Sequence, residues 1–152
     1  MRFTLRISFL LLFLISACIP SRAADKTTIL DQQQLLQLEQ RAEQANPRDQ
    51  CFLYTELVSA MTELAGQQLK SDNPSQATVT LNKIAKYAQL IQVKLSRDTK
   101  RLKNAELLMH RTTYKLNEYM HSASYEDRPT LQATLKQLNQ VQSDILTQVF
   151  NH

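Results

Sequence analysis

The stretch LNKIAKYAQLIQVKLSRDTKRLKNAELLMHRTTYKLNEY (Leu81–Tyr119) decides the fold class of this chain. Its apolar residues recur at alternating steps of three and four positions. This spacing is typical of the a and d positions of a heptad repeat, which direct one narrow apolar stripe toward a partner helix. The seam consists of Leu81, Ile84, Ala88, Ile91, Leu95, Asp98, Leu102, Ala105, Met109, Thr112, Leu116 and Tyr119.

Whether this stretch is one helix or two depends on its middle. No Gly or Pro occurs in residues 75–122, so the sequence predicts one continuous helix, roughly 70 Å long at 1.5 Å per residue. Asp98 is the only charged seam residue and could instead cap a second helix. A break there would produce two helices of similar length and a compact four-helix bundle. The unbroken phase from Leu95 to Leu102 favours the continuous helix.

The flanking segments are also helical in pattern. Proline directly follows a capping asparagine at two places, where it suits the first helical position, and Pro129 lies in the first turn after the cap Asp127. The chain has one Gly and four Pro in 152 residues, which favours helices over strands. We therefore expect an all-α fold, with antiparallel hairpins around one long heptad-patterned central helix. The expected flanking helices are 28–45, 47–71 and 129–150, and the expected caps are Asn46, Asn73 and Asp127.

Gly66 is the only glycine of the chain and lies inside the predicted helix 47–71. Glycine costs about 1 kcal/mol against alanine in a helix. This position therefore predicts either a close approach of another helix or a frayed helix end.

The N-terminus has the pattern of an export signal. Arg2 and Arg6 precede an apolar run, 7–15, that is too short to span a bilayer. Small residues at 21 and 23 predict cleavage after Ala23, which divides the chain into a signal peptide, 1–23, and one helical domain, 24–152. Ile15-Ser16-Ala17-Cys18 predicts a different product, because it resembles a bacterial lipobox with the signal 1–17 and lipidation of Cys18. Both readings place the mature chain in the periplasm or outside the cell, either free or anchored to the membrane as a lipoprotein.

Processing leaves Cys51 without an intramolecular partner. A single cysteine in an oxidising compartment is either buried and unreactive or able to form an intermolecular disulfide. A fold held together by internal disulfides is excluded.

The charge of the mature chain is unevenly distributed. From Ala24 onward it has fifteen Lys and Arg against fourteen Asp and Glu, but between Lys83 and Lys115 nine basic residues face only two acidic ones. Such an excess attracts anionic surfaces or polymers, or is matched by the acidic helices of the same chain or of a second copy. Few aromatic residues accompany it, so we expect no specific nucleic-acid binding. The candidate interaction face consists of Arg97, Lys100, Arg101 and Lys103.

A metal site is the alternative function that the sequence offers. Glu118 and His121 have the Glu-x-x-His spacing of di-iron bundles, and Glu106 and His110 lie one helical turn apart. The motif occurs once, where di-iron bundles use it twice, and ordinary surface residues explain both pairs equally well. We expect neither metal nor cofactor.

Catalysis finds equally little support. Cys51 with His110 or His121 supplies the residue types of a nucleophilic pair, but no Gly-rich turn is present to hold an oxyanion. Glu56 and Glu63 lie two turns apart on one predicted helix, where carboxylates are usually solvated. We expect a protein that is not an enzyme.

Two segments carry a resemblance. NPRDQCFLYTELV (Asn46–Val58) and DTKRLKNAELLMH (Asp98–His110) resemble small exported helical proteins of bacteria that have no assigned activity. The resemblance covers most of the mature chain. It implies export and helices, and it assigns no functional residue.

These observations predict an exported interaction or scaffold protein of the bacterial envelope. A rod two helices thick would leave part of the apolar stripe uncovered, so we expect self-association or docking on a protein partner through helices. An anionic surface is a further possible partner. Membrane attachment is expected only if Cys18 is lipidated, in which case a purely structural tether is an alternative.

Overall fold

The computed structural model describes residues 23–71 and 73–151, with side chains from Gln32 onward apart from residue 72. The described residues form five helices and no strand, which confirms the all-α fold. The predicted signal peptide, apart from Ala23, and Cys18 lie outside the described residues. The helices are α1 (Ala23–Gln44), α2 (Pro47–Lys70), α3 (Pro74–Lys94), α4 (Leu102–Ser122) and α5 (Arg128–Phe150).

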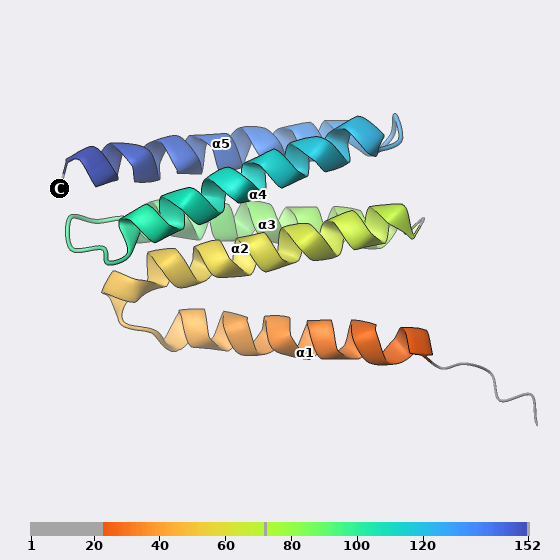
Figure 1. The fold of residues 1–152 in the computed structure, drawn as a ribbon, viewed down its shortest axis with the longest axis horizontal. Helices are drawn as coiled ribbons and strands as arrows, with labels where there is room; N and C mark the ends of the chain where they lie inside the picture. The colour runs from red at the N-terminus through yellow and green to blue at the C-terminus, as the bar shows by residue number, and fades with distance from the viewer. Residues whose placement is uncertain (1–22, 72, 152) are drawn as a thin grey trace, which may run out of the picture.

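Helices α2 to α5 form a four-helix bundle of two antiparallel hairpins (Figure 1). The α2–α3 and α4–α5 hairpins lie side by side, so α2 packs along α4 and α3 packs along α5. Gln137 donates to the carbonyl of Ala85 and Gln92 donates to Asp144, at 2.9 and 2.6 Å. Both bonds join residues 52 apart in the chain, which shows that α3 and α5 run parallel in register.

The predicted continuous helix over 75–122 is wrong. The chain leaves the helix after Lys94, forms a loop at residues 95–101, and starts again at Leu102. Asp98, the one charged seam residue, is exposed in this loop. The heptad pattern continues across the break because the loop has seven residues, the length of one heptad. The a and d positions of both helices therefore still face the core. Folding back allows α3 and α4 to bury their stripes in one shared core, which a single straight helix does not permit.

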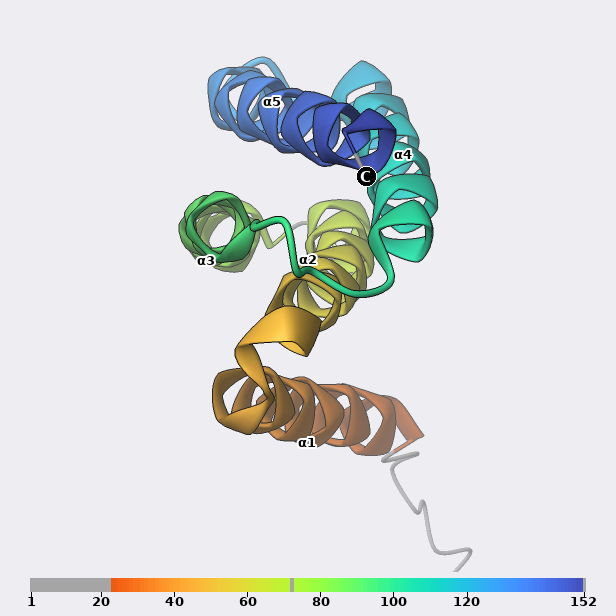
Figure 2. The ribbon, with the colours of Figure 1, turned by 90° about the vertical axis from the view of Figure 1, so that its left-hand side faces the viewer.

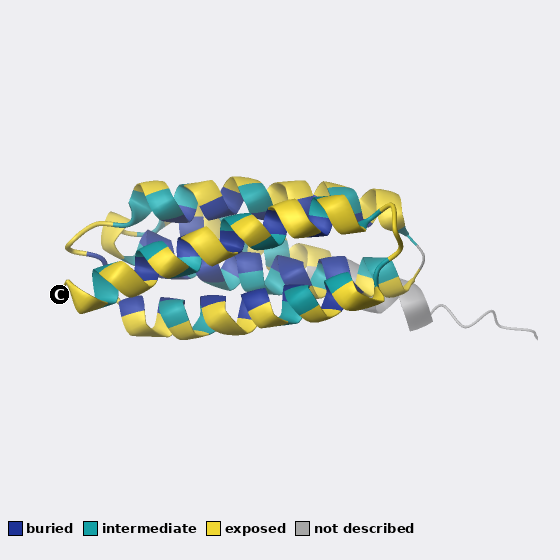
Figure 3. Ribbon diagram, turned by 90° about the horizontal axis from the view of Figure 1, so that it is seen from above, coloured by how far each residue is buried: buried dark blue, intermediate teal, exposed yellow. Residues whose placement is uncertain are grey.

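The heptad seam nevertheless predicts the core. Of its twelve positions, only Leu95 and Asp98 are not buried, and both lie in the α3–α4 loop. Buried residues occupy the inner faces of the helices and exposed residues the outer faces (Figure 3). Helix α2 contributes Leu57 and Val58 to the same core, and α5 contributes Leu131, Leu138 and Ile145.

The predicted caps have mixed outcomes. The Asn46 side chain accepts from the backbone N–H of Arg48 at 3.0 Å, as predicted. Asn73 makes no side-chain cap bond, although its backbone carbonyl accepts the first bond of the helix, from Ala77 N–H. Asp127 makes none either, because its carboxylate accepts from the Ser124 hydroxyl at 2.6 Å. The Asp127 side chain thus organises the α4–α5 turn rather than the helix end.

Helix α1 lies outside the bundle, along α2 (Figure 2). Ala42 is fully buried, and Leu35 and Leu38 pack against the core. Polar contacts support this docking: Arg41 pairs with Glu56 at 3.1 Å, and the Tyr87 hydroxyl on α3 donates to Glu39. These contacts with α2 and α3 explain why the helix is docked.

Candidate functional site: the basic end of the bundle

The α3–α4 loop crosses one end of the bundle, in front of the start of α2 (Figure 2). Two hydrogen bonds join the loop to α2: Lys100 N–H donates to the Arg48 carbonyl at 2.8 Å, and Arg48 Nε donates to the Asp98 carbonyl at 2.9 Å. Thr99 is buried, and its hydroxyl oxygen accepts from Ser96 N–H at 2.9 Å. The loop is therefore tied at its centre to the first turn of α2.

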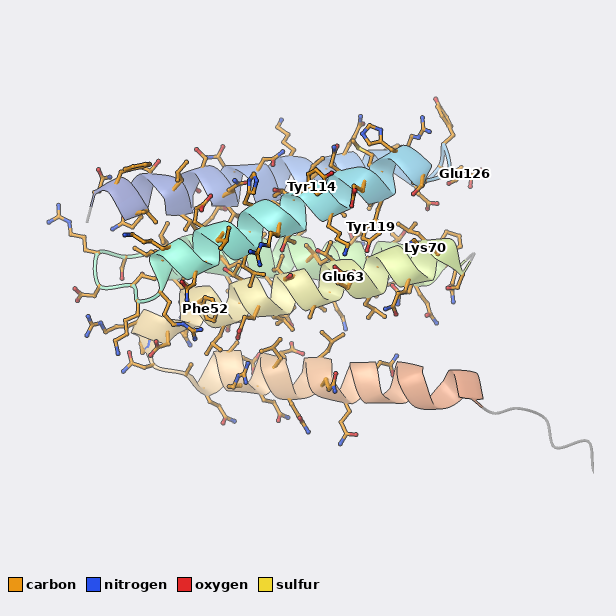
Figure 4. The ribbon with its side chains drawn as sticks, in the orientation of Figure 1. Phe52, Glu63, Lys70, Tyr114, Tyr119 and Glu126 are labelled. Carbon is orange, nitrogen blue, oxygen red and sulfur yellow. The ribbon has the colours of Figure 1, made fainter. Side chains whose placement is uncertain are left out.

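Arg101 is the most unusual residue of this end. Its backbone is left-handed, with φ 61° and ψ 27°, a conformation that costs a residue with a side chain about 1 kcal/mol or more. Its guanidinium lies over the ring of Phe52 at 3.5 Å from the centroid. Phe52 is labelled in Figure 4, where α4 begins beside α2. The stacking holds the positive charge of Arg101 against the fold.

Six basic side chains gather at this end, and we name this set the basic end. Residues 46–49 and 94–103 contain two acids, Asp49 and Asp98, so the local net charge is 6 − 2 = +4. Among the residues that the structure describes, no member of the set is in an ion pair. All are exposed except Lys94, which is half-buried. The basic end consists of Arg48, Lys94, Arg97, Lys100, Arg101 and Lys103.

The start of α4 adds to this positive potential. No side chain caps it, and its first turn contains no acidic residue. The unpaired N–H groups of a helix N-terminus carry a partial positive charge. At the opposite end of the bundle, residues 123–128 carry Glu126, Asp127 and Arg128, for a net charge of −1. The segments 46–49 and 94–103 at one end and the α4–α5 turn at the other therefore carry net charges of opposite sign.

The structure brings the four residues of the predicted interaction face together at this end. The sequence placed them along one side of a long helix, whereas three of them lie in a loop and Lys103 lies in the first turn of α4. Arg48 was missed, because it is 46 positions before Lys94 in the chain. Only the crossing of the loop over α2 brings it into this set.

The candidate metal ligands lie on the outer side of α4. His110, Glu118 and His121 are exposed and Glu106 is half-buried. Glu106 and His121 are fifteen positions apart, or roughly 22 Å along a helix. His110 Nδ1 lies 3.0 Å from Gln142 Nε2 of α5. In the part of the chain that the structure describes, no three His, Cys, Asp or Glu side chains form a group that could hold a metal ion.

Cys51 is buried in the core, and burial raises its pKa to about 12. A thiol in this position is protonated at neutral pH and does not reach a second folded chain. Of the two interpretations that the sequence left open, the structure therefore agrees with the buried, unreactive cysteine. His110 and His121 are exposed, so neither is placed to activate it. Glu56 and Glu63 are engaged in separate ion pairs, with Arg41 and with Lys115.

Glu63 belongs to a polar cluster between α2 and α4. Its carboxylate accepts from the Tyr119 hydroxyl at 2.9 Å and pairs with Lys115 at 3.0 Å, and Lys70 lies 5.5 Å from the centre of the Tyr119 ring. Figure 4 shows Glu63, Lys70 and Tyr119 together between the two helices. Glu63 of α2 binds both Tyr119 and Lys115 of α4, so the cluster joins the two helices.

This cluster predicts a loss of stability at high pH. Burial, followed by the hydrogen bond to Glu63, raises the pKa of Tyr119 to about 12. Because the ordinary value is about 10, the stabilisation is complete below about pH 10 and disappears as the pH rises toward 12. The midpoint of thermal unfolding, measured at increasing pH, should therefore fall less steeply in Tyr119→Phe than in the wild type.

Tyr125→Phe is the matched control, because Tyr125 is 88% exposed and lies in the α4–α5 turn. Its pH profile should equal that of the wild type. Tyr54 and Tyr87, whose pKa values burial raises, contribute to the slope that remains in Tyr119→Phe, as does Lys115, whose pKa its bond to Glu63 raises. Equal slopes in Tyr119→Phe and the wild type would contradict the prediction.

None of the helices in the described part of the chain combines the length and the apolar composition that a membrane crossing requires. No family model matches the chain, and no curated protein or solved structure shows significant similarity to it.

Proposed function

We propose that this chain is a non-enzymatic, exported helical interaction protein of the bacterial envelope, and that the basic end is its contact surface. One observation carries the proposal: six basic side chains at one end of the bundle have no ion-pair partner among the described residues. Unpaired like charges repel one another, and a binding partner of opposite charge removes this cost. The export signal indicated by residues 1–23 places that partner outside the cytoplasm.

The way the basic end is held also supports a contact role. Arg48 is fixed through its hydrogen bond to the loop, and Arg101 through its stacking on Phe52. Side chains that are already positioned lose less conformational entropy when they bind. Internal neutralisation by the acidic residues of the chain was the other interpretation of the basic run Lys83–Lys115. It applies to Lys115, which pairs with Glu63.

The test is binding to envelopes isolated from the bacterium that exports the protein. The test variant carries Arg97→Glu, Lys100→Glu and Lys103→Glu, and it retains Arg101 because that residue packs on Phe52. The control variant carries Lys83→Glu, Arg111→Glu and Lys136→Glu, which are exposed on the middle parts of α3, α4 and α5. Both variants change the net charge equally and replace two Lys and one Arg.

We expect the wild type to sediment with the envelopes and to be released by salt, as screened charge interactions require. The control variant should keep most of this binding, and the test variant should lose it. Thermal unfolding of both variants verifies that they are folded. Sedimentation of the test variant at the wild-type level would refute the assignment of the basic end.

A further inference from the structure

An exposed apolar strip borders the basic end along α4 and α5. The register of these two antiparallel helices follows from Gln142, which contacts Thr113 at 3.1 Å and His110 at 3.0 Å. Continued toward the basic end, the same register places Leu107 opposite Leu146 and Lys103 opposite Phe150. Figures 1 and 2 show the end of α5 beside the start of α4 at the loop end of the bundle.

The three apolar residues of this strip are accessible. Leu107 is 48% exposed, Leu146 is 39% exposed and Phe150 is 81% exposed. Isolated exposed apolar residues are common on proteins, but here three share one seam and adjoin a group of unpaired cations. Phe150 is in the last turn of α5, and this turn contains no charged residue.

We propose that the basic end and the apolar strip together dock on the surface of a bilayer that contains anionic phospholipids. Lys100, Arg101 and Lys103 would contact the headgroup phosphates, and Phe150 would enter the boundary between headgroups and acyl chains. Interfacial binding of this kind combines buried apolar area with attraction to anionic lipids. The inference rests on the proposed function, and it names the partner of the same surface.

The charge distribution favours a bilayer over a second copy of the chain. A two-fold symmetric dimer brings the same patch of both copies together, so the basic ends would face each other and repel. An anionic bilayer offers negative charge to the basic end and an apolar layer to the strip in one surface. This docking also differs from the attachment that lipidation of Cys18 would give, because it needs no covalent lipid.

Vesicle co-sedimentation tests the electrostatic part. The exported protein, with its N-terminus defined by intact mass, is mixed with vesicles of phosphatidylglycerol and phosphatidylethanolamine or of phosphatidylcholine alone. We expect binding to the anionic vesicles only, and a decrease on the order of a hundredfold in the partition coefficient of the Arg97→Glu, Lys100→Glu, Lys103→Glu variant. The variant with glutamate at 83, 111 and 136 should retain most of the binding.

Tryptophan fluorescence tests the apolar part. The chain contains no Trp, so Phe150→Trp introduces a single reporter in the strip, and Tyr125→Trp introduces one in the opposite α4–α5 turn. Both positions are more than 80% exposed, so neither substitution disturbs the core. With anionic vesicles, the emission of Phe150→Trp should shift to shorter wavelength and be quenched by brominated acyl chains. The emission of Tyr125→Trp should not change.

Absence of binding to anionic vesicles would overturn the inference, and so would equal spectral shifts at positions 125 and 150. Binding to a soluble polyanion such as heparin without binding to vesicles would also overturn the lipid assignment. If the protein binds no vesicles, with or without binding to heparin, the proposed function still stands provided that envelope sedimentation depends on Arg97, Lys100 and Lys103. Loss of that dependence would refute the proposed function itself.

Discussion

Replacing Arg97 with proline should change the free energy of unfolding by less than about 1 kcal/mol, whereas Lys83→Pro should lower it by about 3 kcal/mol or more. Arg97 is the second residue of a turn that Thr99 N–H closes by donating to the Ser96 carbonyl at 3.2 Å. Proline is favoured at this place in common turns. Lys83 is exposed inside α3, where proline removes a helical hydrogen bond and collides with the preceding turn.

This pair of substitutions separates the two readings of the central stretch. In a continuous helix over 75–122 both prolines would occupy the interior and would cost about the same. Denaturant unfolding followed by far-ultraviolet circular dichroism measures both changes under identical conditions. A loss of about 3 kcal/mol in Arg97→Pro would contradict the loop at 95–101.

Gly66→Ala should destabilise the protein by about 1–2 kcal/mol, although this change usually stabilises a helix by about 1 kcal/mol. Gly66 is buried in α2, and the Tyr119 ring packs directly on it. A Cβ at position 66 would lie 2.2 Å from Cζ of Tyr119, well inside van der Waals contact. The ring is not free to move away, because its hydroxyl is bound to Glu63 and Tyr119 is only 8% exposed.

A double-mutant cycle isolates this contact. Tyr119→Ala removes the ring, so adding Gly66→Ala in that background should raise the free energy of unfolding by about 1 kcal/mol through helix propensity alone. The sign of the Gly66→Ala effect therefore reverses between the two backgrounds. Stabilisation by Gly66→Ala in the wild-type background would contradict the close approach of α2 and α4.

Part of the candidate site followed from the sequence. The charge count identified the basic segment around Asp98 and the four residues of the interaction face, because an uncompensated excess of Lys and Arg is visible without a structure. Arg48, Phe52 and Phe150 carried no such signal. They join the surface only because the loop crosses α2 and because α5 ends beside the start of α4.

The sequence by itself determined which segments are helical, apart from the break at 95–101, and the face that each helix turns to the core. The Asn-Pro pairs that mark helix starts and the heptad spacing are local properties of the sequence. The seam from Leu81 to Tyr119 is buried except at two loop positions. Only the tertiary structure decided that the seam folds back at 95–101. A heptad pattern specifies which side of a helix is apolar, but it does not specify which chain segment covers that side. A seven-residue loop leaves this pattern unchanged, and the bundle forms because four stripes bury more apolar surface together than two do in a rod.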